Sequence, residues 1–266
     1  MTSTMKMSVL ASGSTGNCIY VESESGSLLI DVGLTCKRIE LALNKIERSL
    51  NDIDAILITH EHSDHIKGLK VIAKRYNIPI FANKKTWQAI ESKNIHVNRE
   101  QKFEFNALNY KEIIGLDVES FNVSHDAVDP QFYTLSQNDK KLSVITDTGY
   151  VSDEMKGIIK DSDVFVFESN HDVDMLRAGR YPWMTKQRIL SDVGHVSNED
   201  AAHAMKDVIT DRTKRIYLSH LSQDNNIKEL ARMSVEQVLN HHDVDTVSHV
   251  ELHDTDKDEP TRIYTL

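Results

Sequence analysis

The sequence predicts an α/β protein in which short buried strands and helices are arranged in layers. Three observations lead to this prediction. Short apolar runs of strand length recur along the 266-residue chain, separated by polar turns. Segments with apolar residues at helical spacing lie between these runs. Each polar cluster suited to chemistry directly follows a short apolar run, which is where active sites of layered α/β folds lie.

The first third of the chain is rich in predicted strands. These strands are Ser8–Ala11, Cys18–Glu22, Leu28–Val32 and Asp54–Thr59. A helix is predicted from about Thr35 to Arg48, because Ile39, Leu43 and Ile46 recur at helical spacing. A second helix is predicted from Asp64 to about Tyr76.

The rest of the chain alternates in the same way. Further strands are predicted at Leu116–Val123, Phe132–Ser136, Leu142–Thr146, Val164–Phe167, Arg215–Leu218, Thr246–Leu252 and Thr261–Leu266. Helices are predicted at Asn198–Ile209 and at about Asn226–Asn240. Either Ser197 or Asn198 can cap the first of these helices, and Glu199 and Asp200 suit the dipole of its first turn.

Composition favours a single cytoplasmic domain over residues 1–266. The chain has only 4 Pro and 10 Gly, and it contains no repeat or linker-like stretch. Its two cysteines, Cys18 and Cys36, do not form a disulfide framework and are expected to be buried thiols in a reducing compartment. We find no signal peptide and no apolar stretch of membrane-spanning length. The net charge of −10 argues against a protein that coats nucleic acid, but not against an enzyme that holds it locally.

The run Thr59-His60-Glu61-His62-Ser63-Asp64-His65 carries the strongest chemical signal. It places three imidazoles and a carboxylate within six residues, directly after an apolar strand. Alternate residues of an extended segment share a face, so His60 and His62 can ligate one ion together. Asp64 and His65 can then reach a second ion from the start of the next helix. Nitrogen and oxygen ligands without a thiolate suit Zn²⁺ or Mn²⁺, and also Fe.

Two ions need more ligands than this run supplies. Three candidates each follow a predicted strand: His125, Asp147 and His220. Asp147 is the natural bridging ligand, because two neighbouring ions need a shared anion besides a hydroxide. The sequence therefore predicts two divalent metal ions per chain.

This ligand pattern resembles the metallo-β-lactamase superfamily, along nearly the whole chain. The resemblance implies a four-layer αββα metallo-β-lactamase sandwich. It implies that one metal is held by His60, His62, His125 and Asp147, and the other by Asp64, His65, Asp147 and His220.

The substrate class depends on two further segments, Phe167–Asp172 and Gly194–Ala201. They resemble the nuclease branch typified by tRNA 3′-processing endonucleases, in which a strand-end Glu orients a His that protonates the leaving oxygen. We therefore assign Glu168 as the orienting carboxylate and His195 as the general acid, and we count Asp64 with them as catalytic. In the expected mechanism a hydroxide that bridges the metals attacks phosphorus.

The whole chain also resembles the YycJ/WalJ group of exonucleases. The shared marks are Ser8–Cys18, Thr59–His65 and Glu168–Asp172. This resemblance implies 5′-to-3′ exonuclease activity on double-stranded DNA and a functional link to a WalK/WalR-type two-component system. The oligomeric state is not indicated.

One segment carries the candidate substrate-binding residues. Between Glu168 and His195 the chain carries basic residues interleaved with aromatic ones: Arg177, Arg180, Tyr181, Trp183, Lys186 and Arg188. This pattern suits a lid or a strand-gripping element, or alternatively a surface helix packed by Trp183. The turn Ser12–Asn17 could cradle a phosphate or be a plain hairpin loop, and His171 could support Glu168 or bind phosphate.

Three other functions stay open. A small-molecule thioesterase or lactonase would not need the Glu168–His195 pair. An RNA-processing nuclease of the tRNA 3′-endonuclease type would use the same pair. A regulatory binding protein without catalysis would not need a full ligand set.

Overall fold

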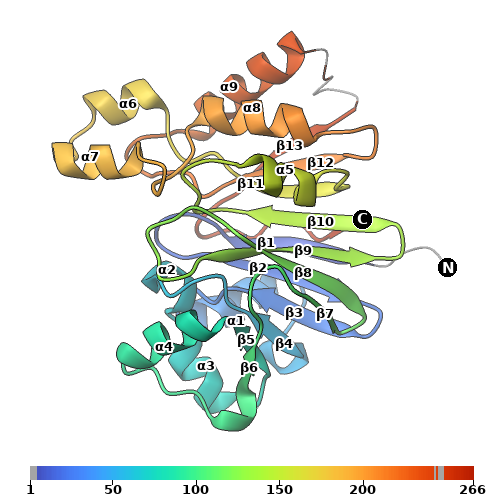
Figure 1. Cartoon of the computed structure of the whole chain (residues 1–266). Coiled ribbons are helices and arrows are strands. Elements are labelled where there is room, and N and C mark those ends of the chain that lie inside the picture. Colours follow the sequence, from blue (N-terminus) through green and yellow to red (C-terminus); the bar gives the residue numbers. More distant parts are fainter. Residues whose placement is uncertain (1–4, 243, 245–248) are drawn as a thin grey trace. The chain divides into compact units, whose positions relative to one another are not determined.

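The computed structural model describes residues 5–242, 244 and 249–266, which fall into two compact units (Figure 1). The first unit comprises the residues up to Asn122 together with Ala127–Lys140 and Thr255–Leu266. The second comprises Val123–Asp126 and Lys141–Asp254. The single-domain organisation stays a prediction.

A seven-stranded mixed sheet forms the centre of the first unit, in the order β14-β1-β2-β3-β4-β5-β6. Its strands are β1 (Lys6–Ala11), β2 (Cys18–Ser23), β3 (Gly26–Ile30), β4 (Ala55–Leu57), β5 (Ile80–Ala82), β6 (Lys102–Glu104) and β14 (Tyr264–Thr265). The strands β1, β2 and β3 are antiparallel, whereas β3 to β6 run parallel. The chain therefore leaves β3 and β4 at the same edge of the sheet, where the first ligand cluster lies.

Helices and three more strands complete the first unit. The helices are α1 (Cys36–Lys45), η1 (Leu50–Asp52), α2 (Ser63–Ile66), α3 (Leu69–Arg75), α4 (Lys84–Ser92) and η2 (Arg99–Gln101). The antiparallel strands are β7 (Tyr110–Ile113), β8 (Leu116–Asn122) and β9 (Gln131–Gln137). The core unites α1, the sheet, α3 and α4 through Leu43, Ile56, Ile72 and Ile90, all fully buried. Burial of such side chains contributes roughly 1.5–3 kcal/mol each.

The second unit is built on four parallel strands. They are β10 (Lys140–Ile145), β11 (Val164–Glu168), β12 (Arg215–Ser219) and β13 (Glu251–Asp254). Its helices are α5 (Asp153–Ile159), α6 (Val173–Ala178), α7 (Trp183–Ile189), α8 (Asn198–Val208) and α9 (Lys228–His241). Because the strands are parallel, the residues that follow β10, β11 and β12 lie together at one edge.

Most predicted elements are present, with boundaries shifted by a few residues. The helix predicted from Asp64 to about Tyr76 is instead two short helices, α2 and α3, separated by Lys67 and Gly68. Ser197 is the residue that caps α8, because its side chain accepts from the backbone N–H of Asp200. Part of the predicted strand Thr246–Leu252 lies outside the described residues, and β13 begins only at Glu251.

Two expectations concern the whole chain. Cys18 and Cys36 are both buried and free of disulfides, as predicted. Within residues 5–242, 244 and 249–266, none of the helices combines the length and the apolar character that crossing a bilayer requires.

Candidate metal centre

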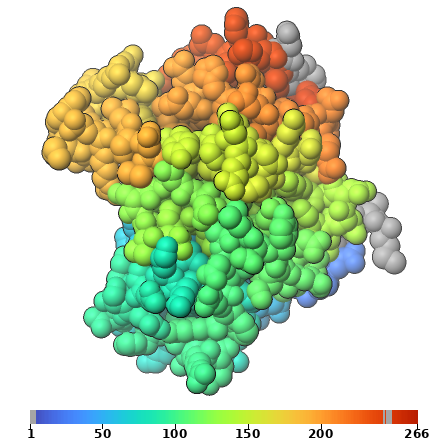
Figure 2. Space-filling model, viewed as in Figure 1, coloured from blue at the N-terminus to red at the C-terminus, as the bar shows by residue number. Residues whose placement is uncertain are grey.

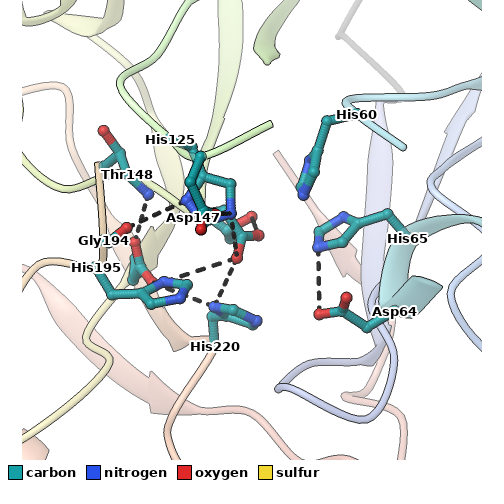
Figure 3. A network of polar contacts seen from close by, with 12 residues as sticks. His60, Asp64, His65, His125, Asp147, Thr148, Gly194, His195 and His220 are labelled. Atoms are coloured by element: carbon teal, nitrogen blue, oxygen red, sulfur yellow. Dashed lines mark hydrogen bonds and ion pairs between the residues drawn. The ribbon is translucent and has the colours of Figure 1, made fainter. Parts of the chain in front are cut away.

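The first ligand cluster follows β4 in the first unit (Figure 3). The ring centroids of His60 and His62 lie 4.7 Å apart, and those of His60 and His65 lie 4.0 Å apart. Asp64 approaches the same group, with Oδ2 3.6 Å from Nε2 of His65. His60 and His65 are fully buried. The predicted residues of the run are therefore gathered into one cluster of imidazole and carboxylate donors.

Asp31, which sequence reasoning missed, supports this cluster from the neighbouring strand. It directly follows β3, and its Oδ2 lies 2.7 Å from Nδ1 of His65. The same carboxylate accepts from the backbone N–H of Thr59 at 2.9 Å and from the Thr59 hydroxyl at 2.8 Å. A carboxylate on Nδ1 fixes the ring and leaves Nε2 as the nitrogen that can ligate a metal. Burial raises the pKa of Asp31, although His65 and Thr59 act in the opposite direction.

The turn Ser12–Asn17 holds the backbone of the cluster. The backbone N–H of Asn17 donates to the carbonyl of Asp64 at 2.8 Å, and the Asn17 side-chain nitrogen lies 3.1 Å from Nε2 of His65. Gly33 lies so close that a Cβ added there would be 1.6 Å from the Asp64 carbonyl oxygen. The close approach of these three segments explains why a glycine stands at that position.

The second cluster lies at the carboxyl ends of β10, β11 and β12 in the second unit. Nδ1 of His220 lies 3.1 Å from Oδ1 of Asp147 and 3.1 Å from Oε1 of Glu168. Together with His195, these residues place four possible ligand atoms within 4.8 Å of one another. Asp147 and His220 have left-handed backbones, with φ of 46° and 54°. Strained residues of this kind are typical of functional sites.

Glu168 and His195 form the pair that the sequence predicted. Nδ1 of His195 lies 2.7 Å from Oε1 of Glu168, and the other Glu168 oxygen accepts from the backbone N–H of Thr148 at 2.8 Å. Burial opposes ionisation of Glu168, but the stronger combined effect of His195 and His220 lowers its pKa. The His195 side chain is 19% exposed, whereas those of Asp147, Glu168 and His220 are 2%, 0% and 3% exposed. His195 is therefore the member of this cluster that a substrate can reach.

His125 joins the second cluster through the short segment Val123–Asp126. Its Nδ1 lies 3.2 Å from the carbonyl oxygen of Gly194, and its Nε2 lies 4.0 Å from Asp147. The ring centroids of His125 and His195 are 5.1 Å apart. The Gly194 carbonyl thus orients the ring so that Nε2 faces the carboxylate.

His171 lies close to the same cluster but is enclosed by protein. It is 1% exposed, and among the described residues neither ring nitrogen has a hydrogen-bond partner. Burial lowers the pKa of His171 to about 4, which keeps the imidazole neutral. This burial does not favour the predicted alternative in which His171 binds phosphate directly.

The structure thus brings together all the predicted site residues in two groups, one in each unit. The first is formed by His60, His62, Asp64 and His65. The second is formed by His125, Asp147, Glu168, His195 and His220. Both groups offer imidazole and carboxylate donors without thiolates, the donor set that divalent ions such as Zn²⁺ and Mn²⁺ accept in proteins.

Comparison with known proteins agrees with this reading. Residues 27–221 match the family model described as "Beta-lactamase superfamily domain". Exodeoxyribonuclease YycJ of Bacillus anthracis is 58% identical over 97% of this chain and 98% of its own length. Exodeoxyribonuclease WalJ of Streptococcus pneumoniae is 50% identical over 96% of both chains. The metallo-β-lactamase fold protein YhfI of Bacillus subtilis is only 15% identical, yet its structure superposes with a TM-score of 0.76 over 98% of this chain and 99% of its own. The predicted fold class is therefore confirmed.

Proposed function

The chain belongs to the β-lactamase superfamily and is a metal-dependent hydrolase, and from this premise we propose that it removes nucleotides from the 5′ end of double-stranded DNA. Two curated relatives that align over nearly their full length carry the name exodeoxyribonuclease, which supports a nucleic-acid substrate. The observation that supports phosphodiester cleavage is the pairing of Glu168 with the partly exposed His195 beside buried donors, and the 5′ polarity and the duplex substrate are proposed from the resemblance alone. Hydrolysis of an ester with a good leaving group does not require such an acid.

The proposed ligands of two divalent ions are those predicted from the sequence. His60, His62, His125 and Asp147 would hold one ion, and Asp64, His65, Asp147 and His220 would hold the other. The donor chemistry of both clusters fits Zn²⁺ or Mn²⁺, with Fe as a further option. When bound, such ions activate a water molecule and neutralise charge on phosphate oxygens.

The protein's own residues then supply the proton for the leaving group. Because Nδ1 of His195 faces Glu168, the proton leaves from Nε2. The bond between phosphorus and the 3′ oxygen of the terminal nucleotide breaks, and His195 protonates that oxygen. Glu168 holds the ring and stabilises its charged form before transfer, and Thr148 holds Glu168 in turn. The products are a mononucleotide and a strand with a new 5′ phosphate.

End-labelled DNA tests this proposal. The purified protein is incubated with Mn²⁺ and duplex DNA that carries a 5′ phosphate, beside single-stranded DNA and RNA, with Asp64→Ala as the control. We expect stepwise release of mononucleotides from the 5′ end of the duplex and none from the variant. Preferential cleavage of RNA would show that the substrate is RNA rather than DNA. If the metal-loaded protein cleaves no nucleic acid, the proposal is refuted.

Substitution of His195 separates a nuclease from a small-molecule hydrolase. His195→Ala should slow phosphodiester cleavage by about 10²–10⁴-fold, the usual contribution of a general acid. A thioesterase or lactonase activity, if present, would survive the same substitution largely intact. Equal loss of both activities would argue that His195 serves the metal site rather than the leaving group.

A further inference from the structure

A two-helix hairpin is inserted between the two residues of the acid pair. It comprises α6 and α7, begins after Glu168 and ends before His195. In Figure 1 the hairpin lies at the left edge of the second unit. In Figure 2 its yellow and orange atoms are exposed on the visible face. The sequence predicted a lid or a strand-gripping element here. The structure shows which basic side chains of the hairpin are bonded within the protein and which are free to bind a ligand.

Two of its four basic residues are used inside the protein. Lys186 is 8% exposed, and its ammonium group donates at 2.7 Å to the carbonyl oxygens of both Arg177 and Gly179. It therefore closes the carboxyl end of α6. Arg188 pairs with Asp126, which lies next to His125. These two cations hold the hairpin together and in place, so they are poorly suited to the substrate contacts that the sequence suggested.

The other two basic residues are available. Arg177 and Arg180 are exposed, and in the described part of the chain their guanidinium groups have neither a hydrogen bond nor an ion pair. Trp183 and Met184, at the start of α7, are 63% and 77% exposed. The alternative in which Trp183 packs a surface helix is therefore wrong. The hairpin therefore exposes two cations with unpaired guanidinium groups and a large flat aromatic ring.

This combination fits a nucleic-acid strand better than a protein partner. Unpaired guanidinium groups suit phosphates, and an exposed indole suits the face of a base, which any sequence offers. In a symmetric dimer this face would meet itself, so Arg177 and Arg180 would approach the same cations of the second copy, and the apolar residues alone would have to overcome that repulsion. Charge complementarity thus selects a polyanion as the occupant.

The hairpin is also tied to the general acid. The backbone N–H of His195 donates at 3.0 Å to the carbonyl of Ile189, the last residue of α7. Gly194 packs so closely that a Cβ there would lie 2.1 Å from that same carbonyl oxygen. A strand that is held on α7 is therefore held at a set distance from His195.

We propose that the α6–α7 hairpin is the strand-gripping element: Arg177 and Arg180 bind phosphates of the DNA strand, and Trp183 stacks on a base near its end. This inference rests on the proposed nuclease function. It names the surface that sets the position of the scissile phosphate relative to His195.

Binding is tested in the metal-loaded His195→Ala background, which prevents rapid cleavage, with 5′-phosphorylated duplex DNA as the probe. Arg177→Ala/Arg180→Ala should lower the slope of log Kd against log salt by about 2, since each lost phosphate contact removes roughly 0.9. The matched control is Arg99→Ala/Arg262→Ala, which removes two exposed arginines of the first unit and should leave the slope unchanged. An equal slope in the hairpin variant and the control would overturn the proposal.

Tryptophan fluorescence tests the stacking directly. The chain has two tryptophans, and Trp87 is 8% exposed with its indole N–H bonded to the Phe103 carbonyl, so DNA should quench the emission of Trp183. Trp183→Ala should weaken binding roughly 5- to 150-fold, whereas Trp183→Phe should retain affinity but lose the quenching. Met233→Ala, another exposed apolar side chain, is the control.

Three outcomes would count against the hairpin in different ways. Normal cleavage with unchanged KM in the Arg177→Ala/Arg180→Ala and Trp183→Ala enzymes would refute the hairpin assignment and leave the nuclease function standing. A change of Trp183→Ala from dimer to monomer in analytical ultracentrifugation, with unchanged DNA affinity, would assign the apolar face to a second copy. Failure of the wild-type protein to bind or cleave any nucleic acid would remove the proposed function and the hairpin assignment together.

Discussion

Replacing Asp31 by Asn should leave the candidate metal ligand His65 in place but change the orientation and tautomer of its ring. In the native protein one Asp31 oxygen accepts from the Thr59 backbone, while the other lies 2.7 Å from Nδ1 of His65. The Asn side chain has only one oxygen, so it can accept a hydrogen bond from Thr59 or from His65 but not from both. If its oxygen stays on Thr59, its NH₂ group faces Nδ1 of His65 and drives the ring proton to Nε2. That nitrogen is the one the proposed metal requires.

The expected magnitude follows from this geometry. Loss of a supporting carboxylate on a ligating histidine lowers metal affinity by about 10- to 100-fold, or about 1.4–2.8 kcal/mol. If the amide instead turns toward Thr59, a buried N–H loses its acceptor, which costs roughly 1–3 kcal/mol of folding stability. The variant should therefore bind metal weakly, unfold more easily, or both.

Competition with a chromophoric chelator measures Zn²⁺ affinity, and thermal denaturation of the metal-free protein measures stability. Asp163→Asn is the matched control, because Asp163 is an equally buried carboxylate that accepts from the Lys141 backbone and from Arg212, both at 3.0 Å. The control should lose stability but keep its metal affinity. Asp31→Asn protein with unchanged stoichiometry and affinity would refute the orienting role of Asp31.

Three further predictions test other parts of the structure. Glu168→Gln should lower kcat on DNA by about 10²–10⁴-fold with little change in KM, because it removes the charge that stabilises protonated His195; steady-state kinetics with unchanged kcat would contradict this. Although burial raises the pKa of Glu22, hydrogen bonds from Arg48, Lys6 and Tyr20 lower it from 4.5 to about 2, so its stabilisation is complete above pH 4.5 and is lost as the pH falls toward 2. Acid denaturation should show a loss of roughly 1–3 kcal/mol in that window that Glu22→Gln lacks, and identical pH profiles would exclude this role. Gly33→Ala should prevent the turn Ser12–Asn17 from packing on the metal motif and lower the thermal midpoint, whereas Gly157→Ala, where a Cβ meets nothing within 4 Å, should not.

The gathering of Asp147, Glu168 and His220 could be predicted from sequence because each stands at the end of a short apolar strand or just after it. Parallel strands deliver their carboxyl ends to one edge, so Asp147, Glu168 and His220 were brought together as that rule requires. Local composition was sufficient here, since strand, turn and ligand are adjacent in the chain.

Asp31 was not predicted as a site residue because its role depends on a segment that is distant in the sequence. The sequence placed it inside the strand Leu28–Val32, but the strand ends at Ile30 and the backbone turns to a φ of 60° at Asp31. Its partners, Thr59 and His65, lie about thirty residues further along the chain. The sequence does show an aspartate directly after an apolar run. Its role becomes visible only when β3 pairs with β4, because this pairing brings Asp31 next to Thr59.

The break at Gly68 has a similar cause. Helical spacing continues through Leu69 and Ile72, but a Cβ at Gly68 would lie 2.6 Å from the carbonyl oxygen of Leu34. The chain passes another segment there at close range, and its backbone N–H donates to Val32 rather than continuing a regular helix. Tertiary contact thus overrides a periodic pattern that, by itself, indicates one helix.

The left-handed backbones of Asp147 and His220 set a limit on how this protein can be made more thermostable. Each non-glycine residue in that region costs on the order of 1 kcal/mol, so glycine at these positions would relax the chain. A library screened only for heat resistance should therefore enrich glycine at the very positions on which catalysis is proposed to depend. Heat resistance and turnover would then diverge, and any screen for robust variants of this enzyme has to demand activity at each round.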